Sequence, residues 1–230
     1  MKKHSFIVEI FTFIICFLFF VLPPLFVFGS NFNDQTFQSW TFPWYQIITG
    51  SLFFCFYIFY INNSYDKKLT SIELKQKFLF ISFTIVFILA LLFFNSLVFK
   101  FLALLFPKGS NQLQVIKPNT FQEFLFCMIN FGFSAIYEEV LYRAYLPEAL
   151  ILLFRINVKE NTKFKYISLF FAEAIGALLF AFAHIYAGWL SVLNAILAHL
   201  ILRLIYRKTG NIYINITAHW LYNLLILLVF

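Results

Sequence analysis

The chain has 230 residues, of which 62% are hydrophobic and 12% are charged, and its formal net charge is +7. A soluble domain has roughly 45–50% apolar and about 25% charged residues, so this composition excludes an ordinary soluble protein and indicates a polytopic membrane protein. The positive charge does not indicate a nucleic-acid partner, because the Lys and Arg residues lie in short segments between apolar runs, where they set membrane topology.

Seven apolar runs are predicted to cross the membrane, since a helix needs about 20 residues to span the hydrocarbon core. These runs cover residues 6–28, 44–62, 78–98, 121–154, 166–185, 189–206 and 212–230. We therefore expect an all-α fold, a polytopic integral-membrane helical bundle of about seven transmembrane helices.

Three of these runs are expected to be irregular. Pro23 and Pro24 should kink or end the first span, because proline lacks a backbone N–H. The segment 98–106 either continues the third span or lies as an interfacial helix. The fourth run is longer than one crossing requires, so it should be tilted or broken, with Gly132 and Pro147 as the expected weak points.

Basic residues alternate between the segments that connect the runs. The N-terminus and the segments 64–77, 155–165 and 203–208 are rich in Lys and Arg, whereas residues 30–43 and 185–188 have none. The positive-inside rule then predicts a multi-pass protein of the cell membrane with a cytoplasmic N-terminus and an external C-terminus. The abundance of Phe, Ile, Asn, Lys and Tyr, with only 7 glycines, is typical of an AT-rich genome and favours a bacterial source.

Two carboxylates and a guanidinium interrupt the fourth run. A charge at the bilayer centre costs about 2.5–3.5 kcal/mol or more, so these groups need partners or a function. Glu139 and Arg143 are four residues apart and lie one above the other on a helix, which predicts a structural ion pair. Glu138 points along a different face and would be left free to face a cavity, where it could act as a general base. The alternative is a buried ion-paired cluster that only locks helices together.

A histidine follows one helical turn after Phe180. We expect His184 on the fifth helix, on the same face as Phe180. Taken alone, an intramembrane histidine is more typical of a hydrogen bond between helices than of catalysis. Glu173, eleven residues earlier on nearly the same face, either lines the same cavity or lies near the membrane interface, and we favour the latter.

The last span carries a second polar pair. His219 and Asn223 are four residues apart, so their donors could converge on a developing oxyanion. The alternative is a polar seam between helices. His199 on the sixth span has no such partner and is interpreted as a packing residue.

The ordered set of pairs resembles a known family. Glu-Glu-x-x-x-Arg at 138–143, Phe-x-x-x-His at 180–184 and His-x-x-x-Asn at 219–223 match, in order and spacing, the motifs of the CAAX protease and bacteriocin-processing (CPBP, Abi) family of intramembrane endopeptidases. The segment 206–211 is also similar to the sequence that precedes the family's third motif. The similarity covers about half of the chain, residues 118–230.

The resemblance implies proteolysis of a membrane-anchored or prenylated-type peptide or protein in the lipid bilayer. Glu138 and His184 would activate a water, and His219 with Asn223 would stabilise the tetrahedral oxyanion. The supporting residues would be Glu139, Arg143 and Phe180. It also implies one membrane domain, with three family-variable spans in residues 1–117 and the catalytic core in residues 118–230.

Two accounts of the chemistry remain open at this point. In a metal-free glutamic peptidase no cofactor is required. In a metalloprotease Glu138, His184 and His219 would be zinc ligands with an open fourth position. We favour the metal-free account because the zinc version leaves Asn223 without an obvious role. In either case we expect a water-filled cavity between the fourth, fifth and seventh spans.

Two other functions compete with proteolysis. A bacteriocin immunity or membrane scaffold protein would use the same polar residues only to hold the bundle together. A small transporter could use them for proton coupling, but the chain has no inverted repeat.

Overall fold

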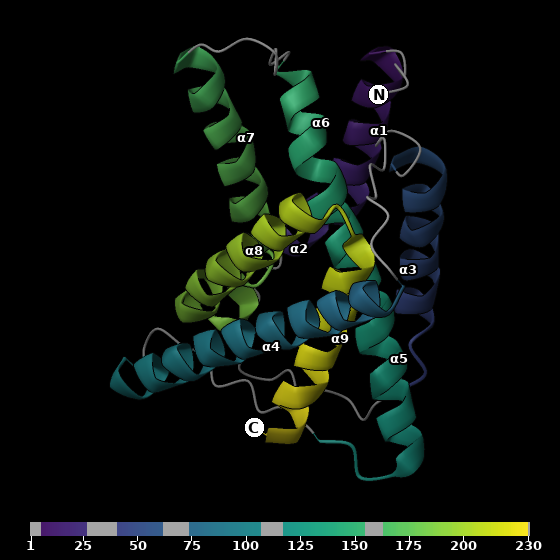
Figure 1. Ribbon diagram of the computed structural model, residues 1–230, viewed down its shortest axis with the longest axis vertical. Coiled ribbons are helices and arrows are strands. Elements are labelled where there is room, and N and C mark those ends of the chain that lie inside the picture. The colour runs from purple at the N-terminus through teal and green to yellow at the C-terminus, as the bar shows by residue number, and fades with distance from the viewer. Residues whose placement is uncertain (1–5, 27–40, 62–73, 107–116, 155–162, 230) are drawn as a thin grey trace.

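The computed structural model describes residues 6–26, 41–61, 74–106, 117–154 and 163–229 (Figure 1). Six of its helices are long and apolar enough to cross a membrane, and a shorter apolar helix, Phe6–Val21, precedes them. The six are Trp44–Ile61, Phe78–Leu105, Phe121–Leu153, Phe164–Phe182, Trp189–Thr209 and Ile212–Val229. The predicted all-α membrane bundle is confirmed. Six of the seven predicted runs overlap these candidate spans, and the first run falls on the shorter helix Phe6–Val21.

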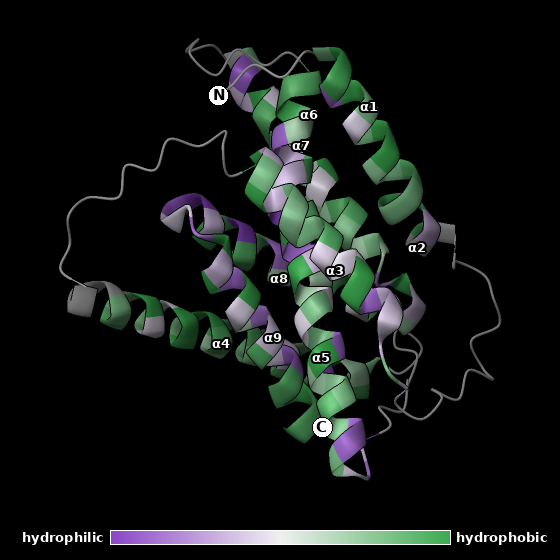
Figure 2. Ribbon diagram, turned by 90° about the vertical axis from the view of Figure 1, so that its right-hand side faces the viewer, coloured by the Kyte–Doolittle hydropathy of each residue, from purple (hydrophilic) through white to green (hydrophobic). Residues whose placement is uncertain are grey.

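Polar side chains are concentrated inside the bundle and many large apolar ones face outward. Phe83 and Leu104 are each 76% exposed, whereas Glu139 and Arg143 are 0% exposed. Hydrophobic residues predominate along α1 (Phe6–Cys16) and α4 (Leu74–Leu105) in Figure 2. This distribution is the one that a lipid solvent favours, because ionisable groups in a membrane protein face the bundle interior.

The first helix is irregular where its prolines lie. α1 continues through a π-helical turn, Phe17–Val21, into α2 (Leu22–Phe26). An α-helix would pair the Phe20 carbonyl with the amide of residue 24, which is a proline and has no N–H. The Tyr137 hydroxyl donates to that carbonyl instead, at 2.9 Å. The first helix is thereby attached to the residue that precedes Glu138.

The second span lies against the fourth. α3 (Trp44–Phe56) continues into a π-helical turn, Tyr57–Ile61, and packs on α5 (Phe121–Glu138). A Cβ atom at Gly50 would lie only 2.7 Å from the Phe133 carbonyl oxygen, so only glycine allows this close approach. The position of α3 matters because its first turn reaches the cavity described below.

The third span is a single helix, α4 (Leu74–Leu105). The segment that follows residue 98 therefore continues the span as helix. α4 passes across α9 in Figure 1, packs against both α8 and α9, and is joined to both by polar contacts. Asn95 donates to the Asn194 side chain at 2.5 Å, and the hydroxyls of Ser96 and Tyr222 share a hydrogen bond.

The fourth span is unbroken but changes its helical type at the acidic motif. α5 leads into the π-helical segment Glu139–Tyr145 and then into α6 (Leu146–Leu153). The expected weak point at Gly132 was wrong, because this glycine lies inside regular α5 and leaves room for the Trp220 indole. The expectation at Pro147 was closer, since the π-helical segment ends two residues before it.

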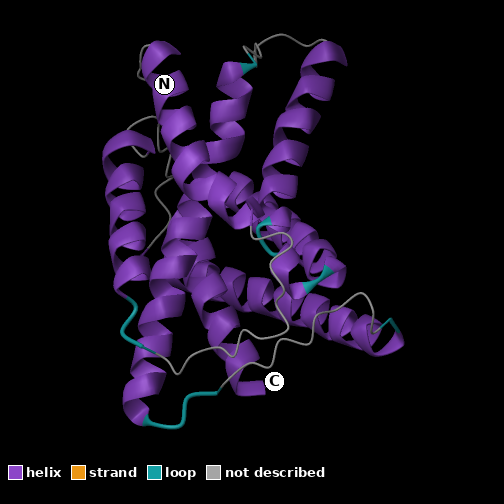
Figure 3. Ribbon diagram, turned by 180° about the vertical axis from the view of Figure 1, so that it is seen from behind, coloured by secondary structure: helices purple, strands orange, loops and turns teal. Residues whose placement is uncertain are grey.

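The last three helices are joined by tight turns (Figure 3). α7 (Lys163–Phe182) is followed by a 3-10 turn, Ile185–Ala187, and then by α8 (Trp189–Thr209) and α9 (Ile212–Val229). Gly188 and Gly210 have φ angles of 93° and 61°, which favour glycine, and each stands where the chain reverses.

Candidate active site

Glu139 is the centre of the polar cluster that the motifs form. Its Oε1 accepts a hydrogen bond from His219 Nδ1 at 2.8 Å, and its Oε2 accepts one from Asn215 Nδ2 at 3.2 Å. Arg143 Nε lies 3.5 Å from Oε2, and both side chains are fully buried. The structure therefore contains the predicted Glu139–Arg143 pair, and it also joins the first motif to the third.

Arg143 joins the first motif to the second. Its guanidinium carbon lies 3.8 Å from the centroid of the Phe180 ring, in a cation–π contact. Such contacts contribute about 2 kcal/mol when the cation is desolvated. The Phe180 ring also lies 4.6 Å from the His184 ring, so one phenylalanine contacts both the buried cation and the motif histidine.

His184 lies in the turn beyond α7, so the expectation that it lies on the fifth helix was wrong. The helix ends at Phe182, and His184 takes φ −103° and ψ 8° because the chain is already turning towards α8. His184 Nδ1 is 2.9 Å from the Phe180 carbonyl oxygen. A carbonyl only accepts, so Nδ1 carries the hydrogen and the neutral ring keeps Nε2 as an acceptor.

Desolvation is the largest influence on the pKa of His184 and lowers it below the ordinary value, although the Glu138 carboxylate acts in the opposite direction. His184 is outside the six spans but surrounded by side chains. The neutral form is therefore favoured, and with it an acceptor nitrogen that can take a hydrogen bond from a water.

Glu138 differs from its neighbour in having no hydrogen-bond donor for one oxygen. Within the described part of the chain, its buried Oε2 accepts no hydrogen bond. His219 Nε2 lies 3.9 Å from that oxygen, too far for a direct bond. Because His219 Nδ1 donates to Glu139, Nε2 is the atom that faces Glu138, and the two groups can be bridged by a water or a substrate oxygen.

Glu138 and His184 share a cavity of about 600 Å³. Its walls are Tyr45, Gln46, Tyr137, Glu138, Tyr142, Phe180, Ala183, His184 and Tyr186. The cavity thus lies between the second, fourth and fifth spans, and our expectation that the seventh span would line it was wrong. The close approach of α3 to α5 at Gly50 places α3 in this wall. The hydrogen bond to Glu139 holds His219 on the side of Glu138 away from the cavity wall.

Asn223 is the motif residue that the structure does not join to the others. Among the described residues it makes no hydrogen bond, and it is not part of the cavity wall. Asn215, which sequence reasoning missed, instead bridges Glu139 and the Leu202 carbonyl, at 3.2 and 2.8 Å. The signal was present, because Asn215 is four residues before His219 and so on the same helical face.

Other residues considered from the sequence lie outside the cavity. His199 is 1% exposed and packs 5.6 Å from the Phe180 ring. Glu173 binds Arg203 on α8 and does not line the cavity.

The residues considered as zinc ligands are not grouped as a metal site in the described structure. Within the ranges that the structure describes, no three His, Cys, Asp or Glu side chains are placed to hold a metal ion. His219 and His184 each engage a protein acceptor through Nδ1, the Glu139 carboxylate and the Phe180 carbonyl, so each ring keeps Nε2 for another partner. This engagement of the second nitrogen is compatible with both accounts of the chemistry.

A carboxylate with an oxygen that no described group satisfies, facing a cavity inside a membrane bundle beside two histidines, is typical of a functional site in a membrane protein. Residues 120–225 match the family model described as Type II CAAX prenyl endopeptidase Rce1-like. This segment holds all three motifs, and it is similar to the CAAX prenyl endopeptidases that the family model describes. No curated protein and no solved structure matches the chain.

Proposed function

We propose that the protein cleaves a membrane-anchored or prenylated-type peptide or protein with a water activated by Glu138 and His184. The observation that carries the proposal is the contrast between two adjacent carboxylates. Glu139 is engaged by three partners, whereas Glu138 faces the cavity with an oxygen that no described group satisfies.

The proposed reaction begins with a water held in the cavity. His184 Nε2 accepts one of its hydrogens and orients it, and Glu138 takes the other proton as the oxygen attacks the carbonyl carbon of the peptide bond. The carbonyl oxygen becomes an oxyanion, which His219 Nε2–H stabilises when the ring is doubly protonated. Asn223 would act as the second donor only after its side chain turns towards the cavity, which it does not line in this structure. Glu138 then returns its proton to the departing nitrogen, leaving a carboxylic acid and an amine.

The remaining motif residues support this arrangement, and of these only Phe180 also lines the cavity. Glu139 orients His219 through Nδ1, because a carboxylate partner fixes which nitrogen carries the hydrogen, and Asn215 in turn donates to Glu139. Arg143 balances the Glu139 charge, and Phe180 covers Arg143.

The cavity favours a substrate with bulky apolar groups, since five of its nine lining residues are aromatic. We propose residues 118–230 as the catalytic core, although Tyr45 and Gln46 show that the N-terminal spans contribute walls to the cavity. The proposed location is the cell membrane of a bacterium, with the N-terminus in the cytoplasm and no nucleic-acid partner.

Gln46→Ala is expected to raise KM about tenfold with little change in kcat. Gln46 is the one carboxamide in the described cavity wall, so it is placed to bind the peptide main chain, and losing one such hydrogen bond costs about 1–1.5 kcal/mol. Steady-state cleavage of a lipid-anchored peptide measures both constants. Ile48→Ala is the matched control, because Ile48 is on α3 but 58% exposed and outside the cavity. An equal effect of both variants would exclude a substrate contact.

The proposed function is tested by cleavage of a fluorogenic, lipid-anchored peptide library by detergent-purified protein. We expect activity that is lost in His184→Ala and unchanged by a strong chelator, because the proposed reaction uses no metal. A chelator-sensitive activity that zinc restores would contradict the metal-free mechanism. Liposome flux under the same conditions would identify a transporter instead.

A further inference from the structure

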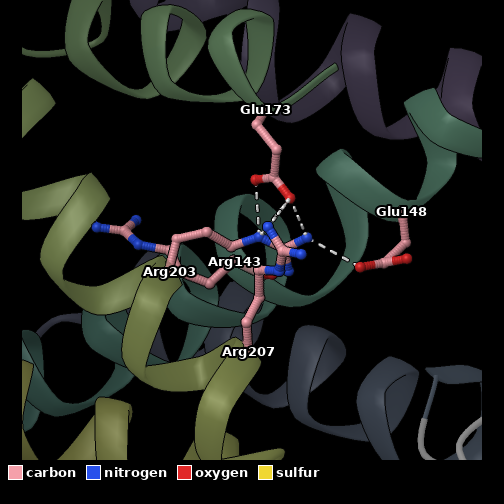
Figure 4. Close-up of polar contacts among 5 residues, drawn as sticks. All are labelled: Arg143, Glu148, Glu173, Arg203 and Arg207. Carbon is pink, nitrogen blue, oxygen red and sulfur yellow. Dashed lines mark hydrogen bonds and ion pairs between the residues drawn. The ribbon is translucent and has the colours of Figure 1, made fainter. Parts of the chain in front are cut away.

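Arg203 on α8 is a buried cation that the proposed reaction does not use. Only 4% of the residue is exposed. Glu173 from α7 and Glu148 from α6 converge on its guanidinium (Figure 4). Arg203 Nη2 lies 2.7 Å from Glu173 Oε1 and 2.9 Å from Glu148 Oε1, and Nε donates to Glu173 Oε2 at 2.9 Å.

The remaining arm of this guanidinium reaches the catalytic segment. Arg203 Nη1 donates to the main-chain carbonyl of Arg143 at 2.6 Å. An α-helix would pair that carbonyl with the amide of residue 147, which is a proline and has no N–H to give. Arg203 therefore supplies the hydrogen bond that Pro147 removes, at the place where the fourth span is π-helical.

The residue beside Arg203 holds the other side of the site. The Leu202 carbonyl accepts a hydrogen bond from Asn215, and the same Asn215 nitrogen donates to Glu139. Two consecutive residues of α8 thus fasten both the π-helical segment and α9, which carries His219. Arg143 is held at its main chain by Arg203 and at its side chain by Glu139 and Phe180.

We propose that Arg203 is a positioning residue for the peptidase site. It holds the π-helical segment Glu139–Tyr145 in register, so that Glu138 faces the cavity while Glu139 faces His219. If Arg203 only joined neighbouring helices by ion pairs, its contacts with Glu173 and Glu148 would be enough and the bond to Arg143 would not be needed. The Nη1 bond to Arg143 is the contact that links Arg203 to the site, and Glu173 and Glu148 hold the guanidinium in the orientation that makes it.

The test compares Arg203→Lys with Arg207→Lys. Lysine keeps the charge beside Glu173 but lacks the planar fork that reaches Glu173 and the Arg143 carbonyl together. Arg207 is the matched control, because it lies 3.7 Å from the same Glu173 oxygen but its side chain is 59% exposed and has no bond to the catalytic segment. The proposal rests on the proposed function for its kinetic readout, so hydrogen exchange of the amides of residues 139–146 is measured as well.

Arg203→Lys is expected to speed exchange in this segment and to lower kcat about 100-fold with KM unchanged, as expected for a misplaced catalytic group. Arg207→Lys should do neither. In a Pro147→Ala background the new amide at 147 can pair with the Arg143 carbonyl, so the effect of Arg203→Lys should shrink about tenfold. The proposal would be overturned if Arg203→Lys left the exchange rates unchanged. It would also be overturned if Arg203→Lys lowered kcat as much in the Pro147→Ala background as in the wild type. If the wild type cleaves no peptide, the proposed function fails while the exchange data still decide the role of Arg203.

Discussion

Glu138→Gln is expected to lower kcat by a factor of about 10²–10⁴, the usual contribution of a general base, while the protein stays folded. Glutamine has the same shape but cannot take a proton from water. Because Glu138 Oε2 is buried without a hydrogen bond in the described structure, removing its charge should leave the thermal stability unchanged or raise it. Peptide cleavage and thermal unfolding of the same detergent-purified sample measure the two effects.

Glu123→Gln is the matched control for this substitution. Glu123 lies in the first turn of the same helix, where it accepts a hydrogen bond from the Asn119 amide, and glutamine can still accept it. A Glu138→Gln protein that unfolds like wild type and cleaves like wild type would remove Glu138 from the reaction. A loss of stability and activity together would favour the immunity or scaffold function, in which the carboxylates only hold helices.

Glu139→Gln is expected to have the opposite phenotype, a loss of about 3–5 kcal/mol in the free energy of unfolding. The substitution leaves Arg143 buried without its counter-charge, since no other carboxylate in the described ranges lies within ion-pair distance of it. It also removes the charged acceptor that fixes His219. Unfolding in a graded denaturing detergent gives the stability difference from wild type.

The double variant Glu139→Gln, Arg143→Met tests the cause of that loss. It removes both charges and leaves an apolar side chain below Phe180, so it should be more stable than Glu139→Gln alone. Equal stability of the single and double variants would show that the ion pair is not what Glu139 contributes. Neither variant should recover activity, because His219 is no longer held between two carboxylates.

The positions of the spans could be predicted because they depend on composition. The positions of the irregular backbone segments could not. Residues 44–62 and 212–230 match the observed helices almost to the residue, since an apolar run of that length has few alternatives in lipid. Of the two weak points expected in the fourth span, Gly132 was wrong, and Pro147 lies two residues after the π-helical segment Glu139–Tyr145. Its cause is not local to the fourth span, because the carbonyl freed by Pro147 is satisfied by Arg203, 60 residues away.

The site was predictable as far as helical spacing reaches. The pair Glu139–Arg143 was predicted from an interval of four residues. The position of Asn215 in the same cluster could have been predicted from its interval of four residues to His219. The cavity wall did not follow, because the contact between α3 and α5 depends on the fit of Gly50 against Phe133, which no spacing within one helix encodes. The end of α7 before His184 likewise depends on the direction in which the next helix departs.

The hydrogen bond between Tyr137 and the Phe20 carbonyl bears on how the two halves of the chain can evolve. The α-helical partner of the Phe20 carbonyl would be the amide of Pro24, which does not exist, and Tyr137, the residue next to Glu138, donates to this carbonyl. Any apolar helix with a carbonyl at the position of Phe20 could accept the hydrogen bond from Tyr137, whatever its other side chains are. We therefore expect the lipid-facing residues of the first helix to vary freely among relatives. Pro24 and Tyr137 are expected to be replaced only together.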